Sequence, residues 1–572
     1  MDPLIVIIVA TAATAAVGRT AAAAYRRKSE SLDALRKSWG HPAARAPKPE
    51  DARLYHDLRS ADDDTWTLGD RTWNDLFMPQ VFAQICHTRS APGGQILYRM
   101  LRCPSFSAEE ISNRNSVIES LSVKSGQREN LQQLLDALNS EDAAQLPNLF
   151  LTEMPLRPAY WWACPVLTLL MIAAIAGAIF NHGLVIVTIP LMITNLAVAK
   201  VFRDSVDAWI HPLRVCNTLV RQSRKVAETV NSGDCAGLKR LVQPINDAGP
   251  ALAELDRTTR WLLFERNSSG DPIMILVEYI NMILLLDVNS FLFAMEAIRK
   301  HHVVLGKLFE TIGMVDALIG VASYRHSIKQ WCVPQFHANS RKMSLQGALH
   351  PILPDGVPNS LEIDGHGILI TGSNMSGKTT FIRTVAINTL LAQSIATCTA
   401  ESYCAEMMGV ESSIGRSDSL SEGRSFYMDE VETIGDFLEE ADGEAPCMFI
   451  IDEIFRGTNT TERVAASKAV LDCLNQPGRS HIVLISTHDV ELPNLLETPF
   501  DRYHFRESVV EGELEFDYLL RPGLSSTRNA LRLLESRGYP AEVVADAMAT
   551  ARKIEDGLEQ RRSLLELERA GS

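Results

Sequence analysis

The feature that most constrains this chain is the segment ITGSNMSGKTTFIRT at residues 370–384. It follows a short apolar run, GILIT, and it precedes a stretch whose apolar residues have helical spacing. Residues 372–379 fit G-x-x-x-x-G-K-[ST], a loop in which backbone N–H groups approach phosphates. Lys378 would bind the β and γ phosphate oxygens, and Thr379 would offer its hydroxyl to Mg²⁺. The sequence therefore predicts a nucleotide-binding α/β domain with ATP and Mg²⁺ as cofactors.

Two later apolar runs end in polar residues that suit the same chemistry. CMFIIDEIFRGTN reads as a buried strand with Asp452 and Glu453 at its carboxyl end, where ligands bind in an open parallel sheet. We expect Asp452 to hold Mg²⁺ through its water shell and Glu453 to orient or activate the attacking water. HIVLISTHD reads as another strand, and His488 at its end is a candidate sensor of the γ-phosphate. These parts predict ATP hydrolysis.

The first apolar run, LIVIIVATAATAAVG at residues 4–18, has two interpretations. A cleaved signal peptide would place its positive charges before the apolar run, whereas this chain has Asp2 there. An uncleaved anchor would place the basic residues 26–28 in the cytoplasm. The charge distribution favours the anchor.

The second apolar region has two charge-free runs of about 20 and 16 residues joined by Asn181, His182 and Gly183. The first begins at the aromatic cluster 160–162, and the second ends before Lys200. Aromatic residues suit the membrane interface and basic residues suit a cytoplasmic flank. The pattern predicts a transmembrane hairpin with both flanks cytoplasmic, and the alternative is a pair of buried core helices.

A third apolar stretch, residues 273–295, contains Glu278 and Asp287. Each charge at mid-bilayer depth costs about 2.5 kcal/mol or more. A third span would also place the ATPase domain on the other side of the membrane, away from ATP. We therefore interpret this stretch as a core helix of a soluble domain.

Charge and cysteine content limit the remaining possibilities. The formal net charge is -15, so no global positive field would attract a phosphate backbone, although a local basic groove could still bind nucleic acid. The ten cysteines include no C-x-x-C pair. This argues against zinc and against a disulfide framework, and it fits reduced thiols in the cytoplasm.

Several motifs together resemble the ATPase domain of the MutS family of DNA mismatch-repair proteins. They are TGSNMSGKTT, SDSLSEGRSFYMDEV, FIIDEIFRGTNTTER, STHD and YHF. Upstream, HTRSAPGGQILYRMLRCP at 87–104 is similar to the start of the family's helical core, and DALIGVASY at 316–324 fits its continuation. RPGLSSTRNALRLLESRGYP resembles the closing segment, which ends in a helical dimerisation element.

The resemblance implies roles for individual residues. Glu453, His488 and Lys378 would be catalytic, and Thr379 and Asp452 would bind the metal. Val357 falls near the family's adenine-stacking position. The implied ATP-binding residues are Gly372, Asn374, Ser376, Gly377, Lys378, Thr379, Thr380 and, from the neighbouring subunit, Ser425. The last role implies a dimer, and we expect a homodimer. The family usually reads S-T-F at that position, whereas this chain has Ser425-Phe426-Tyr427.

The expected fold is an α/β P-loop ATPase domain with an ABC-like, mostly parallel sheet. An all-α core or lever domain precedes it and is interrupted by the transmembrane hairpin. The expected layout is an N-terminal membrane anchor (1–28), a linker or cytoplasmic helical segment (29–75), the first core helices (76–158), the hairpin (159–200), the second core or lever helices (201–345), the ATPase domain (346–540) and a C-terminal helical dimerisation segment or tail (541–572).

Departures from the family lead to two hypotheses about function. We find no mismatch-reading domain and no basic DNA clamp in the sequence, and the hairpin lies between the core segments. The first hypothesis is a multi-pass membrane MutS-like ATPase, with its ATPase domain cytoplasmic, that acts on DNA in mismatch repair or other DNA handling. The alternative is a mechanochemical membrane ATPase that uses the same engine on a non-DNA partner. A transporter ATPase is disfavoured because an L-S-G-G-Q-type signature is absent.

Overall fold

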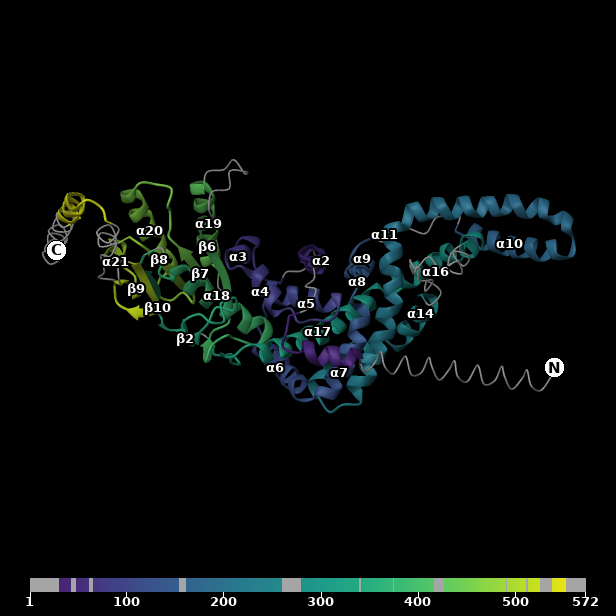
Figure 1. Cartoon of the computed structure of the whole chain (residues 1–572), viewed down its shortest axis with the longest axis horizontal. Helices are drawn as coiled ribbons and strands as arrows, with labels where there is room; N and C mark the ends of the chain where they lie inside the picture. Colours follow the sequence, from purple (N-terminus) through teal and green to yellow (C-terminus); the bar gives the residue numbers. More distant parts are fainter. Residues whose placement is uncertain are drawn as a thin grey trace. The chain divides into compact units, whose positions relative to one another are not determined.

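The computed structural model describes residues 30–42, 48–60, 65–153, 161–259, 279–338, 341–373, 375–415, 426–443, 445–489, 491–510, 513–524 and 538–551. The predicted anchor at 4–18, Glu278, Asn374, Ser425 and most of the C-terminal segment lie outside these ranges. Contacts divide the chain into two compact units (Figure 1). The first comprises residues 1–67, 79–329 and 394–396, and the second comprises residues 68–78, 330–393 and 397–572.

The second unit is built on a six-stranded sheet with the order β10-β9-β4-β8-β7-β6. The five strands from β9 to β6 are mutually parallel, and β10 pairs with β9 in the antiparallel sense. This confirms the predicted mostly parallel α/β sheet. Their bounds are β4 (Gly367–Thr371), β6 (Gly409–Ile414), β7 (Cys447–Asp452), β8 (Ile482–Thr487), β9 (Phe500–Val510) and β10 (Glu513–Pro522).

A smaller four-stranded sheet has the order β1-β5-β2-β3. Its strands are β1 (Gln335–Phe336), β2 (Lys342–Ala348), β3 (Asn359–Asp364) and β5 (Ser402–Ala405). The helices of this unit are α3 (Asp70–Asp75), α18 (Lys378–Ile395), α19 (Phe426–Ala441), α20 (Thr460–Leu474) and α21 (Leu492–Leu495). Strands β7 and β8 are buried at every position, as their continuous apolar sequences require of strands covered on both faces. Phe437 of α19 and Leu471 of α20 belong to the same core cluster as Phe449 of β7.

Helix α3 comes from the N-terminal half of the sequence but packs on β6, the last strand of the large sheet. The carboxylate of Asp75 accepts hydrogen bonds from the Ser412 hydroxyl at 3.0 Å and the Ile414 N–H at 3.2 Å. Thr72 accepts the Ser412 N–H at 3.0 Å. An edge strand has unpaired backbone groups, and α3 satisfies two of them. Residues 68–78 therefore pack with the second unit, which the sequence-based layout did not anticipate.

The first unit is entirely helical among its described residues. Its helices are α2 (Pro49–Ser60), α4 (Met78–Ile85), α5 (Ala91–Arg102), α6 (Ala108–Val123), α7 (Ser125–Leu135), α8 (Glu141–Ala144), α9 (Asn148–Leu151), α10 (Ala163–Phe180), α11 (Val185–Asn231), α12 (Ala236–Leu241), α13 (Gln243–Asp247), α14 (Gly249–Thr259), α16 (Leu286–Lys300) and α17 (His302–Ser327), with 3₁₀ turns at η1 (Asp136–Leu138) and η2 (His182–Leu184). A helix-rich region therefore precedes the α/β sheets, as expected.

Helix α17 is buried along most of its length and carries Asp316 into the start of α5. The Asp316 carboxylate accepts the Ser90 N–H at 2.7 Å and the Ser90 hydroxyl at 2.6 Å. The Ser90 hydroxyl oxygen in turn caps α5 by accepting the Gly93 N–H. A Cβ at Gly93 would lie 2.1 Å from the Asp316 carboxylate, so the close approach requires glycine. Burial raises the pKa of Asp316 to about 6. This contact joins the two sequence segments that resemble the family's helical core.

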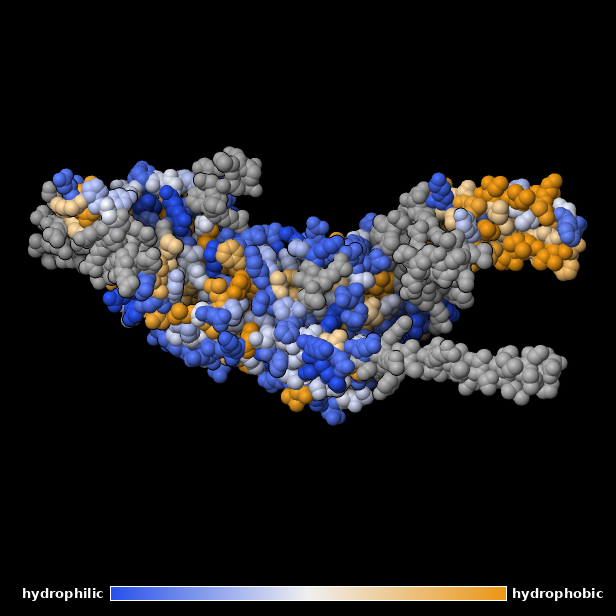
Figure 2. Space-filling view, in the orientation of Figure 1, coloured by the Kyte–Doolittle hydropathy of each residue, from blue (hydrophilic) through white to orange (hydrophobic). Residues whose placement is uncertain are grey.

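Helix α10, η2 and the first part of α11 form the predicted hairpin. Residues Ala163–Phe180 and His182–Phe202 are long and apolar enough to cross a membrane, a test that core helices of soluble proteins also pass. Only 17% and 6% of these windows are buried, however, whereas a soluble core helix is mostly buried. Figure 2 shows the apolar colour gathered on this arm of the molecule. The exposure favours the hairpin interpretation over a pair of core helices, and insertion in a membrane stays a prediction.

The third apolar stretch differs from the expected single core helix. Residues 279–283 are helical, the backbone of Leu285 is left-handed at φ 51°, and α16 follows. The stretch packs on the base of the hairpin as well as on the soluble helix α14. Leu285, Val288 and Leu292 share a core cluster with Cys164 of α10 and Ala199 of α11. A break in the helix thus brings this stretch against both hairpin helices.

Candidate active site

The phosphate-binding loop lies between β4 and α18, as predicted. Gly372 and Gly377 have φ values of 144° and 102°, which side-chain-bearing residues rarely adopt. Lys378 is 3% exposed, and its ammonium donates to the carbonyls of Gly372 at 2.6 Å and Ser373 at 2.8 Å. Burial lowers its pKa, opposed by the nearby carboxylates of Asp452 and Glu453. The lysine is thus held inside the loop where a phosphate would replace the carbonyls as its partner.

The other loop residues have separate positions. Ser376 is 1% exposed, and its hydroxyl donates to the Ser373 carbonyl at 2.8 Å. Thr380, in the first turn of α18, lines the cavity next to the loop. Asn374 and Ser425, both predicted to bind nucleotide, lie outside the described residues.

The end of β7 brings Asp452 to the first turn of α18. The Thr379 hydroxyl donates to the Asp452 carboxylate at 2.8 Å, although the two residues lie 73 positions apart. Ser486, on the neighbouring strand β8, donates to the other carboxylate oxygen. A hydroxyl and a carboxylate in contact are the oxygen ligands that Mg²⁺ prefers, together with phosphate oxygens. The donor set therefore fits a magnesium ion bound beside the phosphates.

Glu453 follows directly, and both of its carboxylate oxygens have partners. Arg456 Nε lies 2.8 Å from one oxygen, and His488 Nδ1 lies 3.0 Å from the other. The Glu453 side chain is 10% exposed, whereas His488 is 50% exposed. The backbone of Glu453 has φ 57°, a strained conformation for a residue with a side chain. The predicted catalytic acid and the predicted sensor histidine are thus in contact.

Two further carboxylates hold the segments on either side of the Glu453 contacts. Asp489, next to His488, pairs with Arg463 of α20 at 2.6 Å. Glu430 of α19 is 7% exposed and accepts the backbone N–H of Phe455 at 2.6 Å and of Arg456 at 3.2 Å. Phe455 also has a positive φ, 59°. Burial raises the pKa of Glu430, although these two N–H groups and Arg456 oppose the effect. Glu430 therefore holds the loop that carries the arginine partner of Glu453.

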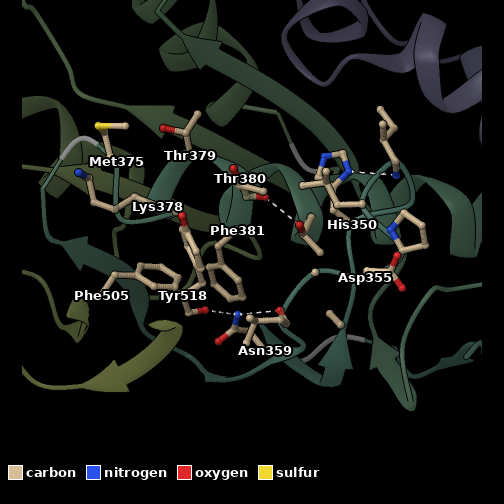
Figure 3. A pocket seen from close by; sticks show the side chains of 18 residues that line it. His350, Asp355, Asn359, Met375, Lys378, Thr379, Thr380, Phe381, Phe505 and Tyr518 are labelled. Carbon is tan, nitrogen blue, oxygen red and sulfur yellow. Dashed lines mark hydrogen bonds between the residues drawn. The ribbon is translucent and has the colours of Figure 1, made fainter. Parts of the chain in front are cut away.

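A cavity of about 880 Å³ opens next to the phosphate loop and is lined by Lys378, Thr379 and Thr380 together with apolar residues (Figure 3). Val357, near the implied adenine position, is among the lining residues. Tyr518 of β10 is 45% exposed, and a Cβ at Gly377 would lie 3.2 Å from its ring. An aromatic ring beside a phosphate loop is suited to stack on a nucleotide base.

The conformation of Tyr518 depends on Asn359. The pairing of β10 with β9 shifts register between Phe516 and Leu520, and Tyr518 has φ 54° within this irregularity. The Asn359 amide donates to the Tyr518 carbonyl at 2.9 Å and accepts the Leu520 N–H at 2.7 Å. The bulge is thereby held with the tyrosine next to the loop.

Five residues of the site were not singled out from sequence: Ser486, Arg456, Glu430, Tyr518 and Asn359. Arg456 and Glu430 lie inside the quoted motifs, so their position beside the catalytic residues was an available signal. Tyr518 and Asn359 lie in strands with no motif of their own, and only the pairing of β10 places them. Among the described residues no cluster of three metal-ligating side chains occurs, and all ten cysteines are free thiols.

Comparison with known proteins gives a consistent result for the C-terminal half. Residues 368–555 match MutS domain V. The chain is similar to the DNA mismatch repair protein MutS of Thermus thermophilus, with 31% identity over 265 residues, 45% of this chain and 31% of that protein. It is also similar to the DNA mismatch repair proteins MutS of Thermus aquaticus (34% over 212 residues, 36% and 26%) and Lactobacillus acidophilus (28% over 281 residues, 47% and 32%).

These matches support the MutS family for the C-terminal half of the chain. The resemblance seen in the motifs is thus supported by these matches, which lie in the C-terminal half of the chain. The matched part spans about a third of the length of these relatives. The predictions of a membrane-anchored branch and of individual site roles stay predictions.

Proposed function

We propose that this chain is a membrane-anchored ATPase of the MutS type that binds ATP with Mg²⁺ and hydrolyses it as a dimer. The observation that carries the proposal is the contact of Thr379 with Asp452 beside Glu453. It joins a phosphate loop, a metal-binding pair and a carboxylate able to orient water, which are the parts that phosphoryl transfer requires.

The chain's own residues divide the work of hydrolysis. Lys378 neutralises charge on the terminal phosphates, and Thr379 and Asp452 hold the Mg²⁺, which supplies further charge stabilisation when bound. Glu453 orients the attacking water and accepts its proton. In the structure its oxygens contact Arg456 and His488, so a water must displace or share one of these partners. His488, the more exposed of the two, is the partner best placed to exchange.

The adenine would occupy the cavity between Val357 and Tyr518. Tyr518 supplies an aromatic face, and the strained bulge held by Asn359 places it before any ligand binds. Preorganisation of this kind lowers the entropy cost of binding. Ser425, as the resemblance implies, would complete the site of a second copy, which makes the dimer the hydrolytic species.

The cellular task we propose is DNA handling related to mismatch repair, carried out at a membrane. Its support is the name shared by the relatives, each a DNA mismatch repair protein, together with the exposed apolar hairpin. The hairpin would place the multi-pass chain in the bilayer with its ATPase unit in the cytoplasm. Action on a non-DNA partner is the alternative outcome of the test below.

The first test uses the full chain in detergent. Lys378→Ala and Glu453→Gln should each lower ATP turnover by at least about 100-fold, because each removes a group that stabilises the transition state. Glu453→Gln should still bind ATP, measured with a fluorescent analogue. The control is Glu439→Gln on α19, an exposed carboxyl outside the site. Normal turnover by Glu453→Gln would contradict the assignment.

The second test separates the two tasks. Binding of the dimer to homoduplex and mismatched DNA is measured with and without ATP over a range of salt concentrations. Salt-dependent binding with a mismatch preference supports DNA handling, since phosphate contacts release counterions. ATP turnover with no DNA binding at low salt supports the non-DNA partner. A topology assay that placed residues 210–340 outside the cytoplasm would contradict the proposed orientation.

A further inference from the structure

The broken stretch at residues 279–293 is tied to the hairpin by neutral polar side chains. Asn195 of α11 donates its amide to the Ile283 carbonyl at 2.7 Å. Thr168 of α10 donates its hydroxyl to the Leu284 carbonyl at 2.8 Å, and it accepts from the Asn289 amide at 2.8 Å. Side chains from both hairpin helices and from α16 thus meet at the break.

The two carbonyls capped in this way, those of Ile283 and Leu284, lie directly before the left-handed Leu285 at the break. With Leu285 left-handed, the helix that ends near residue 283 does not continue directly into α16. In water, carbonyls at such a break would be hydrated. In hydrocarbon, broken helices are tolerated only where protein groups replace the missing partners. Asn195 is fully buried, and Thr168 is 9% exposed, as such replacements must be.

The polar contacts lie inside the candidate spans, not at their ends. Thr168 is about 8 Å along α10 from its start at Ala163, at a rise of 1.5 Å per residue. Asn195 is about 10 Å from the end of the second span at Phe202. With a hydrocarbon thickness of about 30 Å, the break lies roughly a third of the way into the bilayer.

Exposed apolar side chains accompany the break. Ile280 is 44% exposed and Phe293 is 47% exposed. The Phe293 ring packs edge-on against Trp161, at the start of the first span, with 6.4 Å between centroids. Aromatic side chains gather at membrane interfaces. These two side chains therefore suit contact with lipid near the headgroup boundary.

We propose that residues 279–293 form a third lipid-contacting element, a shallow re-entrant turn clamped to the hairpin by Thr168, Asn195 and Asn289. The turn would contact lipid at the depth of the upper acyl chains of the bilayer. α16 leaves the turn through Arg299 and Lys300, basic residues that suit the cytoplasmic side of a membrane. The re-entrant path keeps the ATPase unit cytoplasmic, which a third span would not.

The inference rests on the proposed membrane insertion of the hairpin, and the experiment separates the two. The photoreactive residue p-benzoylphenylalanine is placed at single positions of the full chain in phosphatidylcholine–phosphatidylglycerol vesicles. Lipid adducts are measured by mass spectrometry after irradiation. The test positions are Ile280 and Phe293. The hairpin position is Ile186, which is 80% exposed. The matched soluble positions are Phe106 (45% exposed) and Val123 (83% exposed).

We expect lipid adducts at Ile280 and Phe293 at least about 5-fold above those at Phe106 and Val123. Adducts at Ile186 alone would overturn the re-entrant turn and leave the hairpin standing. Adduct yields at Ile186 no higher than at Val123 would overturn the hairpin and the turn together. These outcomes differ, so failure of one proposal is not read as failure of the other.

The clamp is tested by removing its amide. Asn195→Leu, of similar size, should lower lipid adducts at Phe293 at least about 3-fold and leave those at Ile186 unchanged. The matched control is Asn217→Leu in the same helix, because Asn217 is equally buried but bonds to Thr259 outside the hairpin. Unchanged adducts at Phe293 in the Asn195 variant would overturn the clamp.

Discussion

At the candidate active site most of the buried polar side chains that we describe are charged, whereas the polar side chains at the base of the hairpin are neutral and bond to backbone carbonyls and to one another. Glu453 lies between an arginine and a histidine, and Lys378 is held near two carboxylates. Asn195 and Thr168 cap the carbonyls of a broken helix. The first arrangement suits the charge of a bound nucleotide, and the second gives two backbone carbonyls at the break a partner from the protein.

The two regions differ in which kind of side chain is exposed and in what that exposure indicates. In the ATPase unit, an exposed polar residue such as His488 is available to a ligand. In the hairpin, the large exposed side chains are mostly apolar, as contact with lipid would require. Charge added to the hairpin should therefore change membrane partition, and charge removed from the candidate active site should change ATP turnover.

The largest expected effect comes from adding charge to the hairpin. Ile172→Lys with Ile193→Lys introduces two charges at exposed positions near the middle of the two spans. At about 2.5 kcal/mol each, the pair should lower partition into vesicles by about 1,000-fold or more, measured by flotation. ATP turnover in detergent should stay within about 2-fold. Val123→Lys is the control. If the double variant still floated with the vesicles, the hairpin would not be the part of the chain that enters the membrane.

Removal of Glu430 should have the next largest effect. Glu430→Ala frees the N–H groups of Phe455 and Arg456, so the loop that positions Glu453 loses its buried acceptor. We expect kcat to fall about 10- to 30-fold with little change in KM, and Glu430→Gln to recover part of the loss. Asp429→Asn, the exposed neighbour on the same helix, should be neutral in steady-state assays. A rise in KM alone would instead place Glu430 in substrate binding.

Tyr518 should affect binding more than turnover. Tyr518→Ala removes the aromatic face beside Gly377 and should raise the KM for ATP about 5- to 10-fold, since base stacking contributes about 1–3 kcal/mol. Tyr518→Phe keeps the ring and should behave like the original chain. Affinity for inorganic tripolyphosphate, measured by competition, should be unchanged in both variants. Weaker tripolyphosphate binding would mean that the tyrosine acts on the phosphates.

The smallest effect concerns Glu411, a carboxyl of β6 that accepts from Thr72 at 3.0 Å. Burial, aided by the charges of Glu440 and Asp436, raises the pKa of Glu411 from 4.5 to about 7. The folded chain then binds more protons than the unfolded chain between these values, so stability falls as pH rises from about 4.5 to 7.

Glu411→Gln should remove that pH dependence and stabilise the chain by about 1–2 kcal/mol at pH 8, with no gain at pH 4. Thermal unfolding of the full chain at several pH values measures the effect. Glu439→Gln, at an exposed position, is the control. A pH profile that stayed unchanged in the Glu411 variant would show that the pKa of this carboxyl is not raised in the folded chain.

Much of the second unit could be predicted from sequence because its motifs are local. Four apolar residues before Asp452 specify a buried strand, and glycines at 372 and 377 specify the loop, whatever else the chain does. The hairpin was predicted for the same reason, since length and absence of charge are local properties. Most residues that line the cavity next to the phosphate loop were not predicted. The position of Tyr518, for example, depends on a bulge in the pairing of β10 with β9.

The sequence by itself therefore determined the kind of site and the kind of hairpin. Only the tertiary structure decided which residues surround them: Glu430 beneath the catalytic loop, α3 along β6, and Asn195 against the broken helix. The physical reason is that a buried hydrogen bond to a backbone group needs only one acceptor or donor at the right distance. Many residue types can supply one, so the sequence carries no pattern for it, and the fold selects the partner.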